Sequence, residues 1–426
     1  MNSDYKVSNE EGKTITFSKI CEEMLELLDN KTVNDSAITE DNIMKLFTGV
    51  VDYGFNNPTP IQAKTIIPIF KGQDVIAQSQ SGTGKTGAFA IGCLSRIDPK
   101  KRYPQAIIMA NTRELAQQIN SVCKMLSKHI GLRTCLSIGE YMNVGKNISV
   151  ARESHVIIGT PGRIENIIKE GAFNMKKIKV LVLDEADELL SENFIQTMKS
   201  IITRLPSSAQ ICIFSATLND DELAITKRFM TGPYEVTLEK EDLSLDIIDQ
   251  FKVVLDDERH KIYALNDLYT KIPISQSVIF TNTKKSAMYV HNKMVNDNHM
   301  VGLLHGEMSS DERIEVLLDF RKGKLRALVT TNVIARGIDV QDIGLIFNFD
   351  IPKDPNTYLH RIGRSGRYGK RGVAINLVSQ AKPRNPKYKS DVENLNFISN
   401  HFKKEINDMP EPDTICSILR GAELAK

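Results

Sequence analysis

Short runs of β-branched and other apolar residues, each ending in small or polar residues, are the feature that most constrains the fold. Five occur in the first half of the chain, and each leads into a helical pattern: DVIAQSQ, QAIIMAN, HVIIG, VLVLDEAD and ICIFSAT. Strands that are apolar on both faces and alternate with helices are typical of a parallel sheet covered on both sides. The first half therefore predicts an α/β domain.

The same pattern begins again in the second half, with SVIFTNT, MVGLLHG, RALVTTN, IGLIFNF and GVAINLV. Between the halves lies TLEKEDLSLD, a charged stretch without apolar periodicity. A chain of 426 residues is also longer than one hydrophobic core usually serves. We therefore expect an extension at 1–40, a first domain at 41–238, a linker at 239–247 and a second domain at 248–426.

The extension contains KICEEMLELLDN, in which Ile20, Met24, Leu25 and Leu28 recur at helical spacing. This pattern predicts an amphipathic helix. We favour a helix that packs on the first domain over one that binds a partner.

Composition excludes some classes of protein. The 55 Lys and Arg nearly balance the 53 Asp and Glu, so a nucleic-acid site must come from local placement of charge. The six cysteines lack metal-ligand spacing, which suits reduced thiols inside a cell. The N-terminus has no signal-peptide pattern, and no apolar run is long enough to span a bilayer. We expect an intracellular protein without membrane insertion, in the cytoplasm and nucleus.

The stretch SQSGTGKT follows the first predicted strand and opens a helix, as a phosphate-binding P-loop does. Ser79 stands where that pattern has Gly. Backbone N–H groups of the loop and helix would cradle phosphates, Lys85 would reach the β- and γ-phosphates, and Thr86 would ligate Mg²⁺. Alone, GTGKT could be an ordinary glycine turn. The predicted nucleotide-binding residues here are Ser81, Gly82, Thr83, Gly84, Lys85 and Thr86.

The run VLVLDEAD argues against the interpretation of GTGKT as an ordinary glycine turn. Its buried strand would deliver Asp184 and Glu185 to a carboxyl end, where ligands of parallel sheets bind. Asp184 would hold Mg²⁺, partly through water, and Glu185 would orient or deprotonate the attacking water. An acidic pair after a P-loop is what ATP hydrolysis requires, so the predicted cofactors are ATP and Mg²⁺.

DEAD at 184–187, SAT at 215–217 and HRIGRSGR at 360–367 together resemble the DEAD-box family of ATP-dependent RNA helicases. The motifs match in order from about residue 50 to about 378. The resemblance implies two RecA-like domains, which agrees with the periodicity, and RNA as a partner bound through its backbone with little sequence preference.

The resemblance also assigns roles in the first domain. GFNNPTPIQ is similar to an adenine-reading motif in which Gln62 reads the base edge and Phe55 frames it. The family's stacking aromatic falls near position 37, which is Ala37 here, and Phe17 and Phe47 are imperfect candidates. NTRELA and TPGR resemble RNA-backbone clamps. The resemblance implies that the RNA-binding residues of these clamps are Thr112, Arg113, Glu114, Thr160, Pro161, Gly162 and Arg163.

In the second domain, TTNVIARGID resembles a motif in which Thr331 contacts RNA and Gly337 and Asp339 face the nucleotide. Arg364 and Arg367 lie three residues apart, one helical turn, so both could point at one γ-phosphate as catalytic arginine fingers. The residues expected to couple the motifs are Asp187, Ser215, Thr217 and His360.

This division implies that the ATPase is complete only when the domains close, so RNA and ATP would bind cooperatively. We expect a monomer that separates strands locally or removes bound protein. Rival functions are a DNA-dependent motor on the same frame and an RNA clamp that binds ATP without useful turnover.

Several strings, including AQSQSGTGKT and ISNHFKKEIND, are most similar to the family's nuclear-pore subgroup, which remodels messenger ribonucleoprotein during mRNA export. That similarity implies a nucleoporin and an inositol-phosphate-assisted activator as partners. GTPGR and INLV are also similar to translation initiation factor 4A, which implies translation initiation factors instead.

Overall fold

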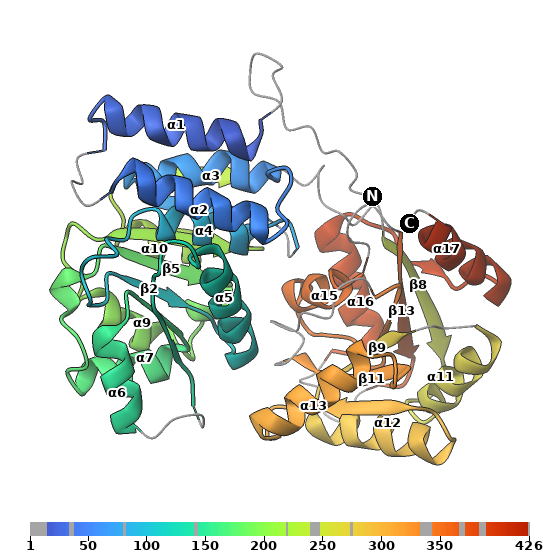
Figure 1. Cartoon of the computed structure of the whole chain (residues 1–426). Coiled ribbons are helices and arrows are strands. Elements are labelled where there is room, and N and C mark those ends of the chain that lie inside the picture. The colour runs from blue at the N-terminus through green and yellow to red at the C-terminus, as the bar shows by residue number, and fades with distance from the viewer. Residues whose placement is uncertain are drawn as a thin grey trace. The chain divides into compact units, whose positions relative to one another are not determined.

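The computed structural model consists of two compact units, one formed by the described residues up to 238 and the other by those from 248 onward. Each unit is described by itself (Figure 1). The structure describes residues 15–33, 38–79, 82–139, 144–218, 220–238, 248–272, 276–332, 343–365, 371–382 and 389–424.

The first unit is built on a parallel sheet that has seven strands among the described residues, in the order β3-β4-β2-β5-β6-β1-β7. The strands are β1 (Val75–Gln78), β2 (Ala106–Met109), β3 (Thr134–Ser137), β4 (Val156–Gly159), β5 (Val180–Asp184), β6 (Gln210–Ser215) and β7 (Tyr234–Thr237). The helices are α1 (Phe17–Asp29), α2 (Glu40–Asp52), α3 (Pro60–Lys71), α4 (Lys85–Leu94), α5 (Arg113–Leu126), α6 (Val144–Glu153), α7 (Pro161–Lys169), α8 (Ala186–Leu189), α9 (Ile195–Ile202) and α10 (Asp220–Lys227), with a 3₁₀ turn, η1, at Met175–Lys177.

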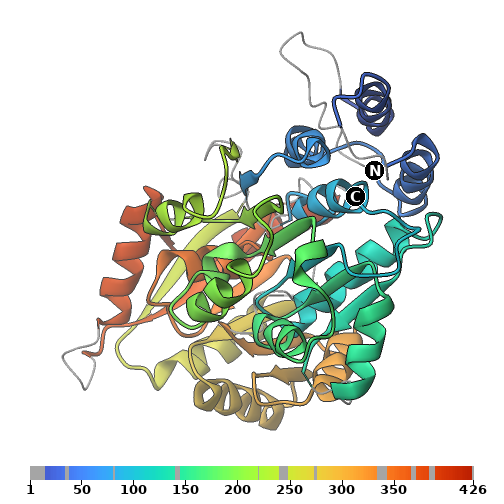
Figure 2. The same ribbon diagram turned by 90° about the vertical axis from the view of Figure 1, so that its left-hand side faces the viewer.

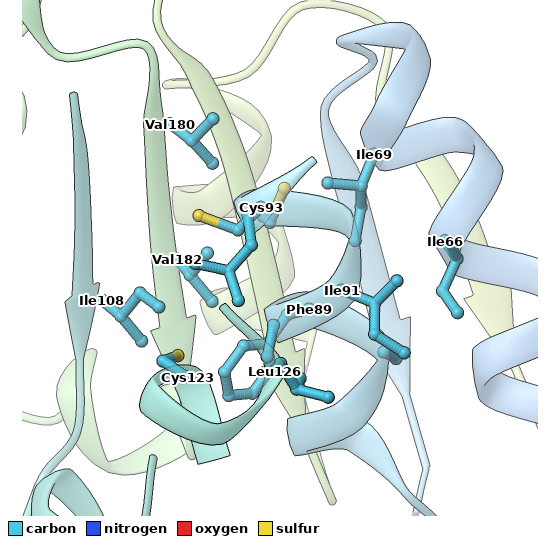
Figure 3. Close-up of a cluster of buried hydrophobic side chains, with 14 of the residues drawn as sticks. Ile66, Ile69, Phe89, Ile91, Cys93, Ile108, Cys123, Leu126, Val180 and Val182 are labelled. Atoms are coloured by element: carbon cyan, nitrogen blue, oxygen red, sulfur yellow. The ribbon is translucent and has the colours of Figure 1, made fainter. Parts of the chain in front are cut away.

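Alternation along the central strands creates two cores, one on each face of this sheet. In β5, Val180 and Val182 pack beneath α4 and α5, whereas Leu181 and Leu183 face α7 and α9. Figure 3 shows the first of these cores, where Phe89 and Cys93 of α4 lie over the valines. Burial on both faces explains why these strands read as unbroken apolar runs.

The predicted N-terminal helix is present as α1 and belongs to the first unit. Its buried residues include Ile20 and Met24, which join the core that also holds residues of α2 and α3. Figures 1 and 2 both show these three blue helices gathered on one side of the unit. The preference for packing over partner binding is therefore supported by the buried face of α1.

The second unit repeats the architecture, again with seven parallel strands among the described residues, in the order β10-β11-β9-β12-β13-β8-β14. The strands are β8 (Ile248–Leu255), β9 (Ser277–Thr281), β10 (Val301–Leu304), β11 (Ala327–Thr331), β12 (Leu345–Asn348), β13 (Gly372–Ser379) and β14 (Asn407–Asp408). The helices are α11 (His260–Lys271), α12 (Lys284–Asn296), α13 (Ser310–Arg321), α15 (Pro355–Ile362), α16 (Asp391–Phe402) and α17 (Pro412–Leu424). The predicted fold class, two tandem RecA-like α/β domains, is confirmed.

The six cysteines are buried and unbonded, as expected of reduced thiols. Among the residues that the structure describes, no helix combines the length and apolar character needed to cross a bilayer.

Candidate nucleotide and RNA sites

The loop after β1 has the backbone of a phosphate cradle. Gly82 and Gly84 have φ angles of 86° and 96°, a left-handed conformation that glycine adopts without steric cost. Helix α4 then begins at Lys85, as predicted, with Gly84 as its N-cap. The first N–H groups of a helix have no partner within the helix and carry the positive end of its dipole, so this turn can bind an anion. Ser81 lies outside the described residues.

Ser79 replaces glycine here without backbone strain, because it is absent from the described non-glycine residues with positive φ. Its N–H donates to the Ser215 carbonyl at 3.0 Å, and its hydroxyl lies 2.8 Å from that of Thr83. Its carbonyl accepts a hydrogen bond from Lys85 Nζ. Lys85 is thus folded back onto the loop, and it must exchange this bond to reach a phosphate.

Gln62 ties helix α3 to this loop. Its side-chain oxygen accepts from the Thr59 N–H at 2.9 Å in a capping box, and Nε2 donates to the Gly84 carbonyl at 3.1 Å. A Cβ added at Gly87 would lie 2.6 Å from that Nε2 and 3.0 Å from Phe55 Cζ. Gln62 and Phe55 therefore meet over the first turn of α4, and the Gln62 amide keeps one donor and one acceptor for an adenine edge.

The aromatic residues beside this position come from the N-terminal helix. The Phe17 ring stacks on Phe55, with centroids 6.0 Å apart and planes 23° apart, and Tyr53 lies 4.7 Å from Phe55 on centroids. Phe47 is instead buried in the core. Ala37 lies outside the described residues. Of the two candidates, Phe17 is therefore the one in contact with the predicted adenine-framing residue.

Strand β5 delivers the acidic pair to its carboxyl end. Asp184 is the last residue of the strand, and its Oδ1 accepts the Glu185 N–H at 3.0 Å. Glu185 has a φ of 52°, which is rare for a residue with a side chain, and it caps α8. Glu185 Oε2 is buried without a hydrogen-bond partner. Strain and an unsatisfied carboxylate oxygen at one residue are typical of a functional position.

Burial, together with the neighbouring Glu185 carboxylate, raises the pKa of Asp184 to about 7, while Lys85 opposes the shift. A buried carboxylate with this pKa gains from a nearby cation. No group of three or more His, Cys, Asp or Glu suited to a metal occurs among the described residues. The Asp184 carboxylate fits Mg²⁺, which typically binds one or two protein oxygens together with water and nucleotide phosphates. Thr86 and Asp184 would hold it.

The third predicted element, SAT, contacts the acidic motif as expected. The Thr217 hydroxyl donates to Asp187 Oδ2 at 3.0 Å, and the Asp187 N–H donates to Ser215 Oγ at 3.4 Å. The Ser215 hydroxyl in turn donates to the Thr217 carbonyl at 2.7 Å. A substitution or displacement of Asp187 would therefore alter the hydrogen bonds at the carboxyl end of β6.

The two predicted RNA clamps of the first unit lie at helix N-termini. Thr112 caps α5 and accepts the Leu115 N–H at 3.3 Å, with Glu114 in the first turn. Half-exposed Arg113 lies against Gly139, where an added Cβ would be 2.9 Å from its guanidinium. A capped N-terminus beside an exposed arginine suits a phosphate.

The second clamp follows β4. A Cβ at Gly159 would lie 2.0 Å from the Ser137 carbonyl oxygen, so glycine lets the ends of β3 and β4 approach closely. Thr160 is the N-cap residue of α7, but its side chain makes no capping hydrogen bond. Pro161 occupies the first helical turn. Gly162 faces open space. Arg163, which follows it, is half-buried.

The second unit places its predicted groups around α15 and β11. Thr331 is the last residue of β11 and is buried, as are His360 and Arg364. Helix α15 ends at Ile362, with Gly363 as its C-cap residue, so Arg364 lies in the turn that follows the helix. Gly337, Asp339 and Arg367 lie outside the described residues.

Sequence reasoning missed Arg361. This residue is fully buried and donates hydrogen bonds to the side chains of Asn282, Asn332 and Asn348. A signal was present in the sequence, because SVIFTNT, RALVTTN and IGLIFNF each carry an asparagine just past or at the end of the strand. Three amides at one sheet edge predict a shared hydrogen-bonding partner.

Comparison with known proteins matches both units. Residues 59–225 match the DEAD/DEAH box helicase family and residues 260–369 the helicase conserved C-terminal domain. The chain is 41% identical over 390 residues to the ATP-dependent RNA helicase FAL1 of Eremothecium gossypii, covering 88% of this chain and 92% of that protein. It is 42% identical over 371 residues to eukaryotic initiation factor 4A of Dictyostelium discoideum, covering 86% and 88%.

Solved structures are also similar. The structure of Saccharomyces cerevisiae Dbp5 bound to RNA and ADP BeF3 matches with a TM-score of 0.80 and 32% identity, covering 89% of this chain and 96% of that chain. Another Dbp5 structure, of a point variant bound to Nup159, a point variant of Gle1, IP6 and ADP, matches with a TM-score of 0.61 and 31% identity, covering 88% of this chain and 99% of that chain.

Proposed function

Because this chain belongs to the DEAD-box family of ATP-dependent RNA helicases, we propose that it hydrolyses ATP when RNA is bound and uses the energy to separate short duplexes or remodel ribonucleoproteins. One observation carries the proposal: Asp184 and Glu185 are both buried at the end of β5, Glu185 has a strained backbone, and the charge of Lys85 in the phosphate cradle acts on the pKa of Asp184. That arrangement supports hydrolysis as well as nucleotide binding.

Each group has a distinct role in the proposed reaction. The N–H groups at the start of α4 and Lys85 hold the phosphates, and Glu185 positions and deprotonates water. Thr86 and Asp184 would hold Mg²⁺ with the nucleotide, and the ion would offset developing negative charge. We propose that Arg364 of the second unit is the guanidinium that stabilises charge on the γ-phosphate.

RNA recognition is proposed to run through the sugar-phosphate backbone. The N-termini of α5 and α7 offer backbone N–H groups close to Arg113 and Arg163, and contacts of this kind do not read the bases. Thr331 of the second unit adds a further phosphate contact. This chemistry predicts binding with little sequence preference.

The test compares ATP hydrolysis by the full chain with no nucleic acid, with RNA, and with DNA of the same sequence. Stimulation by RNA alone is expected, together with separation of a short RNA duplex in the presence of ATP. Equal stimulation by DNA would favour a DNA-dependent motor. Tight ATP and RNA binding with no turnover, unchanged in Glu185→Gln, would favour a non-enzymatic clamp.

For the cellular role, we propose mRNA export, with action in the cytoplasm and nucleus or at the nuclear pore. The serine at position 79 and the likeness to Dbp5 support this role. The partners would then be a nucleoporin and an inositol-phosphate-assisted activator, since Dbp5 structures include Nup159, Gle1 and IP6. We propose that the chain itself is a monomer.

Translation initiation is the second candidate, favoured by the 42% identity to initiation factor 4A. A pull-down of the full chain from RNase-treated native extract separates the two. Recovery of nuclear-pore proteins supports export, and recovery of initiation factors supports translation. Recovery of neither set would overturn both roles and leave the ATPase proposal intact.

A further inference from the structure

A continuous line of buried hydrogen bonds crosses the second unit. The Tyr358 hydroxyl of α15 donates to Gln250 Oε1 of β8 at 3.0 Å and accepts from Asn376 Nδ2 of β13 at 3.1 Å. The Asn376 side-chain oxygen accepts from Asn348 Nδ2 of β12 at 2.9 Å, and Asn348 Oδ1 accepts from Arg361 Nη1 at 3.0 Å. The line therefore leaves α15 at Tyr358, passes through β13 and β12 and returns to α15 at Arg361, with Gln250 of β8 as a branch at Tyr358.

Arg361 continues the line to the ends of two further strands. Its Nε donates to Asn332 Oδ1 at 2.8 Å, and Nη2 donates to the same oxygen. Nη2 also donates to Asn282 Oδ1 at 2.7 Å, and Nη1 donates to the Asp350 carbonyl at 2.6 Å. Asn282 follows β9 and Asn332 follows β11, so one guanidinium joins α15 to the carboxyl ends of three adjacent strands.

The energetics make this connection stiff. These acceptors of Arg361 are all neutral oxygens, and burial lowers the pKa of Arg361 to about 9. A buried donor that loses its acceptor costs about 1–3 kcal/mol, and more when it is charged. Displacement of the strand ends relative to α15 would break several of these hydrogen bonds together. A shift of the strand ends would therefore move α15 with them.

Two proposed functional residues lie next to this hydrogen-bond network in the sequence. Asn332 directly follows Thr331, the proposed RNA contact at the end of β11. Arg361 lies next to His360 and three residues before Arg364, the proposed γ-phosphate contact. We propose that Arg361 is a positioning residue and that its network, from Gln250 and Tyr358 to Asn332, transmits occupancy of the RNA contact to Arg364. This inference rests on the proposed RNA-dependent ATPase.

A purely structural role is the rival explanation, and the chain offers a matched control for it. Tyr269, in the same unit, is also buried, and its hydroxyl hydrogen-bonds the Ser277 side chain at the opposite, amino end of β9. Tyr358→Phe and Tyr269→Phe each remove one buried hydroxyl and keep the ring. Loss of thermal stability is therefore expected in both variants.

The readout is the ratio of RNA-stimulated to RNA-free kcat, measured at saturating ATP beside the Tm of each variant. Tyr358→Phe is expected to lower this ratio about 3- to 30-fold, and Tyr269→Phe to leave it unchanged at a similar loss of Tm. Asn332→Ala is expected to lower it comparably. The double variant Tyr358→Phe with Asn332→Ala should be no worse than the stronger single variant, because both act in one network.

Equal ratios in the two Tyr→Phe variants, or fully additive effects of Tyr358→Phe and Asn332→Ala, would overturn the proposal. Absence of RNA stimulation in the unmodified protein is a different outcome, because it would contradict the proposed function itself.

Discussion

In the first unit β5 ends in two buried carboxylates, whereas in the second unit the carboxyl ends of three strands meet a buried guanidinium group. Asp184 and Glu185 lie side by side near the buried Lys85, and burial holds the pKa of Asp184 near 7. Arg361 is embedded among neutral amides, and Arg364 is buried close by in sequence. The first sheet thus carries a negative half, suited to a cation, and the second sheet a positive half, suited to an anion.

Removing the positive half should have the largest effect. Arg364→Ala is expected to lower RNA-stimulated kcat about 10³- to 10⁵-fold, the range for an arginine that stabilises phosphoryl transfer. ATP binding, measured by nucleotide fluorescence, should change much less. Arg371→Ala is the control, because its side chain is 65% exposed in the same unit. A similar loss of kcat in both variants would contradict the role given to Arg364.

The second largest effect on kcat is expected when Glu185, the proposed general base, loses its charge. Glu185→Gln is expected to lower kcat about 10²-fold or more, because the amide cannot accept a proton from water. Binding of ATP and RNA should persist. Glu192→Gln, an exposed residue of the same unit, is the control. Unchanged ATP consumption in Glu185→Gln would mean that the protein is a clamp and not an ATPase.

The pKa of Asp184 predicts an effect of pH on the same half. The pKa of Asp184 is raised from 3.8 in the unfolded chain to about 7 in the folded protein, so the free energy of unfolding falls as the pH rises from about 4 to about 7. Asp184→Asn should therefore stabilise the metal-free protein by about 4 kcal/mol at pH 8 and by about half as much at pH 5.

The same proton competes with the metal. In the unmodified protein, the Mg²⁺ concentration needed for half-maximal ATPase activity should rise as the pH falls below about 7. Denaturation at the two pH values and a Mg²⁺ titration check these expectations. Equal stabilisation by Asp184→Asn at pH 5 and pH 8 would show that the carboxylate is not responsible.

The smallest expected effect concerns the aromatic stack on the adenine side. Phe17→Ala removes the ring that backs Phe55, so we expect KM for ATP to rise about threefold to tenfold, equivalent to the ~0.5–1.5 kcal/mol of an aromatic pair, with kcat unchanged. Phe47→Ala is the control for lost core packing, since Phe47 is buried elsewhere in the same core. A raised KM in both variants would remove the special role of Phe17.

Central strands and strand-end motifs could be predicted because burial on both faces leaves unbroken apolar runs. Strands β3, β7 and β8 were not predicted, because none is an unbroken run of buried residues: β3 and β8 contain several half-buried residues, and only Val236 of YEVT in β7 is buried. Two-residue β14 carries no pattern at all. The start of a helix at Lys85 was predicted correctly.

Hydrogen bonds between buried side chains that lie far apart in the sequence were not predicted. The hydrogen bonds of Arg361 join residues 282, 332, 348 and 361, which only the folded sheet brings together. The end of α15 at Ile362, which places Arg364 in the following turn, could not be read from local periodicity.

The most direct test of complementary halves is a double-mutant cycle on RNA-stimulated kcat with Glu185→Gln and Arg364→Ala. If the two groups act on one phosphoryl transfer, the double variant will hydrolyse ATP about as slowly as the slower single variant. A double variant slowed by the product of the two single effects would show that the two units act independently, which contradicts the account.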